Sequence, residues 1–525
     1  MSKTLLKSGA IVSGMTLISR VLGLVRDVVI ANLMGAGVAA DVFFFANKIP
    51  NFLRRLFAEG AFAQAFVPVL TEYKQKSAED EVRELVAKVS GTLGLAVTIV
   101  TLFGIIGSPL IAALFGTGWF ISWLNDGPDA AKFELSAFLL KITFPYLWFV
   151  TFTGLSGAIL NAYGRFAVAA FTPVLLNVVI IGFAMLVSPQ LEQPEVGLAM
   201  GVFFGGLVQF LFQLPFLFRL KLLRKPSWGW KHPGVVKIRT LMIPALFGVS
   251  VSQINLLLDT LIASFLVTGS ISWLYYSDRL LEFPLGLFGI AIATVILPSL
   301  SQRHVDANPK QFQQTMDWAV RMVCFLGIPA TIGLALLGHP ILQVLFMRGA
   351  FDQQDVLNAS YSLMAYSGGL LFFMLVKVLA PGYYSRQDTK TPVKIGIIAM
   401  VSNMGFNLIF AIPYGYVGLA IATALSALLN ASLLYRGLHK QGVYKVSRAT
   451  SGCIVRIVLA SVAMGGLIYW LSPVAEQWFA LNWYNSVIQL IICVAAAIAS
   501  YLVLLFCLGI RLAHLKSGFG AVTAD

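Results

Sequence analysis

Charged side chains interrupt segments of this chain that are otherwise apolar enough to cross a membrane. The first segment contains Arg20, Arg26 and Asp27, a second contains Arg54, and a third, near mid-chain, contains Arg279. A charge within a bilayer is costly unless it is paired or serves a function. A guanidinium group keeps its charge when partly desolvated and donates paired hydrogen bonds to phosphate oxygens. Arginines in these positions therefore predict a binding site for a diphosphate.

Helical spacing separates the charges of the first segment. Residues seven apart lie nearly on one face, about 10 Å apart along the axis, so Arg20 aligns with Asp27 and Ser19 aligns with Arg26. Arg20 and Arg26 point in different directions. We therefore expect Arg26, with Asp27, to bind the diphosphate and Arg20 to support the structure. A purely structural ion-pair network within the membrane would account for the same charges.

The second segment contains two adjacent arginines. Glu59 lies four residues after Arg55, which favours a local salt bridge and leaves Arg54 for the ligand. Arg279 is the rough counterpart of Arg54 in the other half of the chain, with carboxylates nearby to orient it. Arg54 and Arg55 could equally extend their charged ends to the membrane surface.

The composition indicates a polytopic membrane protein. The 525 residues are 58% hydrophobic and 11% charged, and the mean hydropathy is +0.83. Apolar runs of about 20 residues predict spanning helices and exclude a barrel of alternating strands. We expect an all-α fold with about 14 transmembrane helices, near residues 8–33, 39–68, 89–115, 136–162, 167–188, 196–218, 240–266, 271–300, 318–346, 358–384, 393–413, 415–436, 450–471 and 482–510.

The net charge of +14 is unevenly distributed between alternate loops. Most Lys and Arg of the loops fall on the side that includes both termini, whereas the opposite loops hold only Lys132 and Arg348 among several acids. The positive-inside rule then places both termini in the cytoplasm. It also explains the charge without nucleic acid as a partner.

Two halves of the chain share weak motifs in the same order. Residues 43–48 and 274–279, each followed by a proline about 20 residues later, are one such pair. We therefore expect an N-terminal lobe (1–225), a C-terminal lobe (226–445) and an appended helix pair with a tail (446–525). Two six-helix lobes with the same orientation form a parallel repeat around a central cavity.

A second polar set lies away from the arginines. It comprises Asp259, Asn403, Asn407 and Thr423. Their oxygens are suited to a small cation, so a Na⁺ or proton coupling site in the second lobe is one interpretation. Hydrogen bonding between helices is the other.

Four stretches of the sequence resemble the MurJ (MviN) family of bacterial lipid II flippases, within the multidrug/oligosaccharidyl-lipid/polysaccharide exporter superfamily. They are residues 19–27, 51–62, 275–280 and 379–386. The resemblance covers nearly the whole chain and implies two six-helix lobes and a helix pair with a groove for the lipid tail. It also implies that the cavity contains Arg20, Arg26, Asp27, Asp41, Arg54, Glu59 and Arg279.

The resemblance also implies that Arg26, Arg54 and Arg279 bind the diphosphate, as the matching arginines are proposed to do in members of the family. Some members of the family carry a sodium site similar to the Asp259 set, although Asn407 stands where an acid would strengthen it.

The hypothesis from the sequence is a flippase of the bacterial inner membrane that moves lipid II outward by alternating access. We expect no covalent chemistry, no cofactor, and Na⁺, H⁺ or the membrane potential as the driving force. Expected partners are lipid II, membrane lipids and, transiently, the peptidoglycan synthesis machinery, with the protein itself a monomer. The alternatives are a multidrug exporter, which should have an acidic cavity, a flippase for another diphosphate-linked saccharide, and a polytopic glycosyltransferase, which needs catalytic carboxylates in large outer loops.

Overall fold

The computed structural model describes residues 3–56, 61–289, 292, 296–297, 299–301 and 309–510. These ranges contain helices and no strand, which confirms the all-α prediction. The chain forms two compact units, one of residues 1–272 with 348–351 and one of residues 273–347 with 352–525. The division into lobes at residues 225 and 445, which rests on the repeat, stays a prediction.

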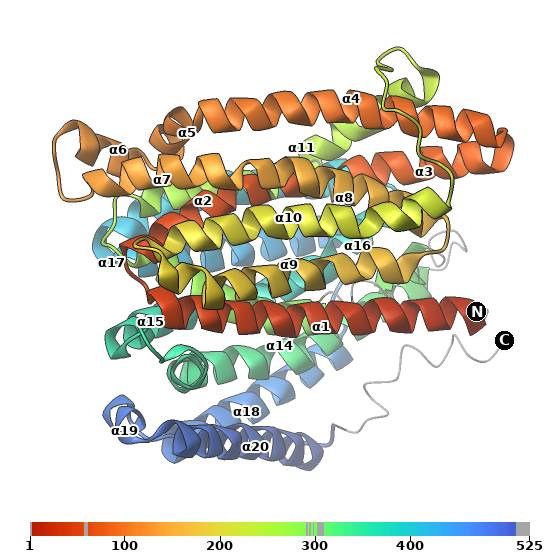
Figure 1. Cartoon of the computed structure of the whole chain (residues 1–525). Helices are drawn as coiled ribbons and strands as arrows, with labels where there is room; N and C mark the ends of the chain where they lie inside the picture. The colour runs from red at the N-terminus through yellow and green to blue at the C-terminus, as the bar shows by residue number, and fades with distance from the viewer. Residues whose placement is uncertain are drawn as a thin grey trace. The chain divides into compact units, whose positions relative to one another are not determined.

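The first unit contains the helices of the first half of the chain and one more (Figure 1). In chain order they are α1 (Lys3–Met34), α2 (Val38–Arg54), α3 (Ala61–Lys76), α4 (Glu79–Ile106), α5 (Ser108–Phe115), α6 (Thr117–Leu124), α7 (Ala130–Thr143), α8 (Pro145–Ala162), α9 (Phe166–Leu186), the 3₁₀ turn η2 (Ser188–Gln190), α10 (Pro194–Arg219) and α11 (Pro233–Ala263).

The second unit contains the remaining helices. They are α12 (Ser270–Pro284, whose first residues belong to the first unit), the π-helical turn η3 (Leu285–Gly289), α14 (Pro309–Phe346), α15 (Gln353–Leu379), α16 (Pro381–Tyr384), α17 (Lys390–Lys440), α18 (Arg448–Leu471), α19 (Ala475–Ala480) and α20 (Trp483–Cys507).

Small residues on α10 allow this helix to pack closely against α9. In Figure 1, α1, α9, α10, α8 and α4 run side by side, and successive members of this series are in contact. A Cβ atom added at Gly201 would lie 2.9 Å from the Phe183 Cβ, and one at Gly205 would lie 2.6 Å from the Leu176 Cδ1. This spacing of four residues is the close-packing pattern of membrane helices. It positions α9 between α10 and α1.

Nine helices in the described part of the chain are long and apolar enough to cross a membrane. The expected number of about 14 is not settled by this criterion, because several expected spans are interrupted. The expected span 89–115, for example, is divided into α4 and α5 at Gly107.

Helix α17 combines two expected spans. The chain reverses at Gly415, whose φ of +56° favours glycine. The Ser426 hydroxyl donates to the Ala399 carbonyl oxygen over 2.8 Å, so the two parts of α17 lie side by side.

Replacement of Gly418 by alanine tests the packing at this reversal. A Cβ atom there would lie 2.0 Å from the Phe410 carbonyl oxygen, so the two parts of α17 would have to separate. We expect Gly418→Ala to lower the free energy of unfolding by about 1–3 kcal/mol, measured as a lower Tm of the purified protein in detergent. Gly405→Ala is the control because an added Cβ there meets no atom within 4 Å. An equal Tm for the two variants would contradict the close contact.

The C-terminal helices belong to the core of the second unit. Helix α18 packs against α14 and α20, and a buried cluster that includes Val323, Met374, Ile457 and Cys493 joins α14, α15, α18 and α20. The outward faces of α18 and α20 carry exposed apolar side chains such as Leu459. Such faces are suited to lipid.

A short segment between α14 and α15 completes the first unit. The Ala350 amide donates to the Asn32 carbonyl oxygen over 2.9 Å. Gly349 has a φ of +57°, and a Cβ atom there would lie 2.1 Å from the Asn32 Oδ1. Residues 348–351 therefore require glycine to reach the end of α1.

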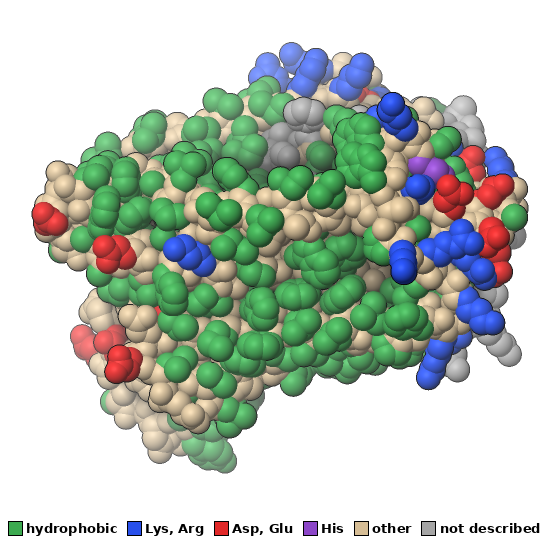
Figure 2. Space-filling model, turned by 45° about the horizontal axis from the view of Figure 1, so that its top comes forward, with side chains coloured by type: hydrophobic (Ala, Val, Ile, Leu, Met, Phe, Trp, Pro, Cys, Tyr) green, Lys and Arg blue, Asp and Glu red, His purple; other side chains and the backbone are tan. Residues whose placement is uncertain are grey.

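Hydrophobic and basic side chains occupy different parts of the surface. On the face shown in Figure 2, hydrophobic side chains cover the middle, and most of the visible Lys and Arg lie towards one end and the upper rim. This distribution agrees with a protein that spans a membrane.

Candidate substrate-binding site

Arg26 of α1 is held by one neighbour in the chain and one from another helix. Its Nη2 and Nε lie 2.7 and 3.0 Å from the Asp27 Oδ1, and its Nη1 donates to the Asn177 Oδ1 of α9 over 3.1 Å. The Asp27 side chain is fully buried and the Arg26 side chain is 16% exposed. The guanidinium is therefore oriented in advance, and part of it stays accessible.

Asn177 also fixes α1 itself. Its Nδ2 donates to the Ser19 carbonyl oxygen over 3.1 Å. The sequence aligned Arg20 with Asp27 on one face of the helix. In the structure, Asp27 forms an ion pair with Arg26, its neighbour in the chain. The half-buried Arg20 side chain makes no ion pair with any described residue. The division of roles between Arg20 and Arg26 stays a prediction.

A row of polar side chains on α2 leads to Arg54. The Asn51 Nδ2 donates to the Asn47 Oδ1 over 3.1 Å, and the Arg54 Nε donates to the Asn51 Oδ1 over 3.0 Å. Residues 47, 51 and 54 lie on one face of a helix because they are four and three apart. This row orients the Arg54 guanidinium along α2.

Arg55 contacts a different helix. Its Nη1 donates to the Gln253 Oε1 of α11 over 3.2 Å. Glu59 lies outside the described residues, so the salt bridge expected between Arg55 and Glu59 stays a prediction. The different roles expected for Arg54 and Arg55 stay a prediction.

Asp41 accepts hydrogen bonds from the N-terminus of α12 and the residue before it. Its Oδ2 accepts from the Gly269 amide over 2.7 Å, and its Oδ1 accepts from the Ser272 amide and hydroxyl over 2.9 and 2.7 Å. The side chain is 2% exposed. The carboxylate is therefore engaged by three donors in the structure, which is an arrangement that fixes the backbone of residues 269–272.

Arg279 lies in the second unit, on α12. Its Nη1 donates to the Glu282 Oε2 over 3.1 Å, and the two side chains are 25% and 46% exposed. This is one of the carboxylates that the sequence placed near enough to orient it. Each of the three arginines assigned to the diphosphate is thus oriented by a partner on its own helix.

The four residues of the candidate cation site are divided between the units. Asp259 of α11 belongs to the first unit, whereas Asn403, Asn407 and Thr423 of α17 belong to the second. Both asparagines are fully buried, and no described residue makes a hydrogen bond with the Asn403 side-chain amide. No group of three or more His, Cys, Asp or Glu side chains in the described ranges could hold a metal.

Asn177, Asn51 and Gln253 were not assigned to the site from the sequence. Each has an uncharged amide side chain, which is a weaker signal in the sequence than a charged arginine within an apolar segment. Asn177 had a signal, because it is the only amide in the apolar sequence of α9, and buried polar groups require partners.

The chain matches known proteins along almost its whole length. The family model "Lipid II flippase MurJ" matches residues 30–489. The chain is 67% identical over 516 residues to "Probable lipid II flippase MurJ" of Vibrio cholerae serotype O1, covering 98% of each chain. It is 38% identical to "Lipid II flippase MurJ" of Burkholderia cenocepacia, covering 96% of this chain and 98% of the relative.

Solved structures give the same result. A structure of "Lipid II flippase MurJ, inward closed conformation" matches with a TM-score of 0.78 and 29% identity, over 94% of this chain and 97% of that one. An inward-facing multidrug resistance MATE family transporter of the MOP superfamily matches with a TM-score of 0.66 over 82% and 97%, at 13% identity, which shows a shared fold alone. The chain is a multi-pass membrane protein and belongs to the MurJ family of lipid II flippases.

Proposed function

We propose that this protein moves lipid II, the undecaprenyl-diphosphate-linked peptidoglycan precursor, from the inner to the outer leaflet of the cytoplasmic membrane. Membership of the family supports the substrate. The observation that carries the mechanism is the pre-oriented, partly accessible Arg26 guanidinium within an apolar helix. No covalent bond changes, and the two lobes expose the site alternately to the two sides.

Arg26, Arg54 and Arg279 bind the diphosphate. Each guanidinium offers parallel donors to phosphate oxygens, and its own partner limits the conformational entropy lost on binding. Asp27 and Glu282 orient Arg26 and Arg279. Asp41 and Glu59 orient the arginines or gate the outer side of the cavity.

Asn177 tests the orientation of Arg26 without removing the charge. Asn177→Ala removes the acceptor for the Arg26 Nη1 and the donor to the Ser19 carbonyl. We expect about tenfold weaker binding of a diphosphate-linked lipid, because one charge-assisted hydrogen bond no longer fixes the guanidinium. The measurement is an equilibrium titration with purified protein. Asn161→Ala, at an exposed position in the last turn of α8, is the control. Equal affinities of the two variants would contradict the role of Asn177.

The driving force is proposed to be the membrane potential together with Na⁺ or H⁺. The buried Asn403 amide and the Thr423 hydroxyl, which donates to the Leu419 carbonyl oxygen over 2.9 Å, offer oxygen ligands that suit a small cation. We expect NaCl to raise the Tm of the wild-type protein above its value in choline chloride, and Asn403→Ala to abolish the difference. An unchanged difference in the variant would exclude Asn403 as a ligand.

We further propose that both termini face the cytoplasm and that the protein acts as a monomer in transient contact with the peptidoglycan synthesis machinery. The distribution of loop charges supports the orientation. Accessibility of single cysteines placed in the loops to an impermeant reagent tests it.

Leaflet-resolved detection of lipid II after depletion of the protein in its own cell tests the function as a whole. Lipid II is expected to accumulate in the inner leaflet and to return to the outer leaflet when the protein is supplied again. If lipid II is distributed normally and another diphosphate-linked saccharide accumulates in the inner leaflet, that saccharide is the substrate and the proposal for lipid II is wrong.

A further inference from the structure

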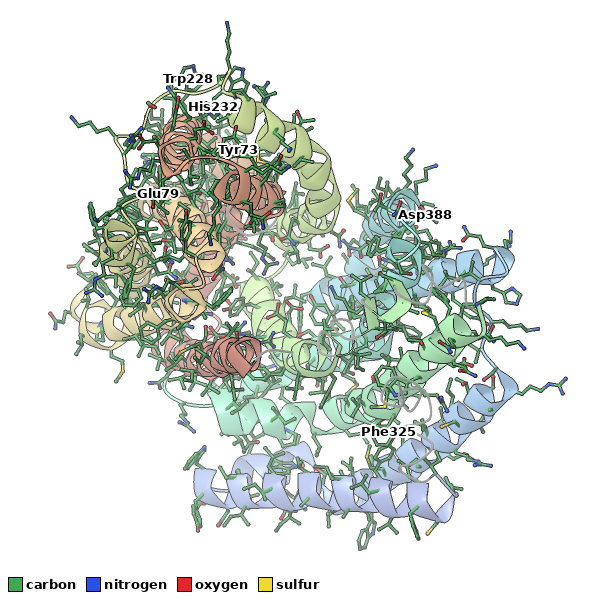
Figure 3. All side chains as sticks on the ribbon, turned by 90° about the vertical axis from the view of Figure 1, so that its right-hand side faces the viewer. Tyr73, Glu79, Trp228, His232, Phe325 and Asp388 are labelled. Atoms are coloured by element: carbon green, nitrogen blue, oxygen red, sulfur yellow. The ribbon has the colours of Figure 1, made fainter. Side chains whose placement is uncertain are left out.

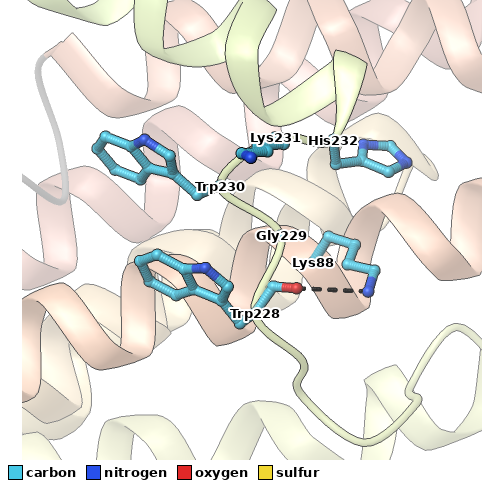
Figure 4. Close-up of a pocket in the computed structure, with 6 residues that line it drawn as sticks. All are labelled: Lys88, Trp228, Gly229, Trp230, Lys231 and His232. Carbon is cyan, nitrogen blue, oxygen red and sulfur yellow. Dashed lines mark hydrogen bonds between the residues drawn. The ribbon is translucent and has the colours of Figure 1, made fainter.

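Two tryptophans form an exposed stack on the loop between α10 and α11. The rings of Trp228 and Trp230 lie 5.8 Å apart with an angle of 5° between their planes. They are 56% and 47% exposed. Both rings point to the same side of the loop (Figure 4). Figure 3, which looks onto this end of the first unit, shows Trp228 and His232 near Tyr73 of α3.

The loop is fixed along the start of α4. The Ser227 amide donates to the Ala87 carbonyl oxygen over 3.0 Å, and the Gly229 amide donates to the Thr92 hydroxyl over 3.1 Å. A Cβ atom at Gly91 would lie 2.2 Å from the Ser227 carbonyl oxygen, so the contact requires glycine. The aromatic pair is therefore presented in a defined position.

Cationic groups surround the pair. The loop and α4 line an open pocket of about 370 Å³. The Lys88 Nζ donates to the Trp228 carbonyl oxygen over 3.3 Å, and the Arg239 guanidinium lies 4.2 Å from the Trp230 ring centre. Lys231 is exposed and pairs with no acid among the described residues. The pocket is lined by Lys88, Trp228, Gly229, Trp230, Lys231 and His232.

Two other basic residues of this region, Arg224 and Lys237, are already paired with acids. Arg224 lies 2.9 Å from an Asp80 oxygen. Lys237 forms a hydrogen-bonded ion pair with Glu72, and this hydrogen bond and the lysine charge lower the pKa of Glu72. These two cations are therefore less available to an anionic ligand than Lys231.

An apolar strip on α4 begins where the loop ends. Leu95 lies seven residues after Lys88 and thus on nearly the same face. Leu95, Ile99 and Leu102 are 48%, 59% and 50% exposed. Proceeding along α4, the surface changes from cations and aromatic rings to hydrocarbon. This is the order of chemistry in a phospholipid, from headgroup to acyl chain.

We propose that the Trp228–Trp230 loop and the adjoining face of α4 bind an anionic phospholipid. Its phosphate contacts Lys231 and Lys88, its glycerol region lies against the stacked indoles, and an acyl chain follows Leu95 and Ile99. Basic residues attract anionic headgroups, and tryptophans prefer the same interfacial depth. None of the arginines assigned to the diphosphate belongs to this site, and its occupation does not depend on flipping activity.

Titration of the purified full-length protein in detergent with phosphatidylglycerol or phosphatidylcholine, followed by native mass spectrometry, tests the proposal. We expect tighter binding of phosphatidylglycerol, and about fivefold weaker binding in Lys231→Gln, the effect of one basic group near an anionic surface. Trp228→Ala is expected to weaken the binding of both lipids. The controls are Lys440→Gln and Trp470→Ala, which alter an exposed lysine and an 81% exposed tryptophan elsewhere.

Equal affinity of the wild type for the two lipids, or equal loss in Lys231→Gln and Lys440→Gln, would overturn the proposal. So would displacement of phosphatidylglycerol from the Lys231-dependent site by lipid II at equal concentration, because the site would then belong to the substrate. If Trp228→Ala does not fold, Lys231→Gln decides the result alone.

Discussion

Lipid II translocation is expected to fall to background when Arg26, Arg54 or Arg279 is replaced by alanine. A hydrogen bond to a charged group contributes about 1.5–3 kcal/mol, so each loss should weaken diphosphate binding by about tenfold to a hundredfold. The cost extends to the partner, since Arg26→Ala leaves the fully buried Asp27 without its Arg26 ion pair. Translocation of fluorescent lipid II in proteoliposomes, combined with binding of the same lipid, measures both effects.

The matched control is Arg165→Ala, which removes an exposed arginine from the loop before α9. Arg→Lys variants at the three positions should restore part of the activity, because lysine keeps the charge but not the paired donors. Three alanine variants that insert normally and translocate lipid II at the wild-type rate would refute the assignment.

Replacement of Asp41 by alanine is expected to reduce stability strongly. The change leaves the Gly269 amide and the Ser272 amide and hydroxyl without the carboxylate that accepts from them. Unsatisfied buried donors cost about 1–3 kcal/mol each, so a loss of about 3 kcal/mol or more is expected. Thermal unfolding of the purified variant in detergent gives the size of the effect.

A graded series separates the structural role of Asp41 from a role in binding. Ser272→Ala removes one donor and should cost about 1 kcal/mol, and Asp41→Asn, which retains one acceptor, should be intermediate. Glu192→Gln, an exposed acid of the same unit, is the control. An Asp41→Ala variant with the wild-type Tm but lost affinity for lipid II would show that the carboxylate acts on the ligand.

Apolar length and composition are sufficient to predict the helices, but not where they are interrupted. The expected spans 393–413 and 415–436 leave only Tyr414 between them, which is one residue before the glycine at which α17 reverses. The interruption of the expected span 89–115 at Gly107 was missed, because hydropathy does not change there. The periodicity of a sequence indicates which residues are buried and which face lipid. A local change in the direction of a helix depends instead on backbone angles, which many residue types permit.

The charges of the candidate site were predictable from the sequence, and their partners only in part: Glu282 was expected near Arg279, but Asn177 was not expected near Arg26. Arg26, Arg54 and Arg279 are conspicuous because charge within an apolar segment is costly. Asn177 lies 151 residues from Arg26 in the chain, so their contact depends on how α9 packs on α1. The alignment of Arg20 with Asp27 used an ideal helix, whereas the flexible Arg26 side chain can fold back to its own neighbour.

The segment at residues 348–351 has a consequence for biosynthesis. It follows α14 in the chain, yet it completes the first compact unit at Asn32 of α1. A ribosome must therefore synthesise all of α14 before the N-terminal unit has all its parts. Folding of the first unit during translation stays incomplete until then, and expression of residues 1–272 alone would yield a product that lacks one of its own contacts.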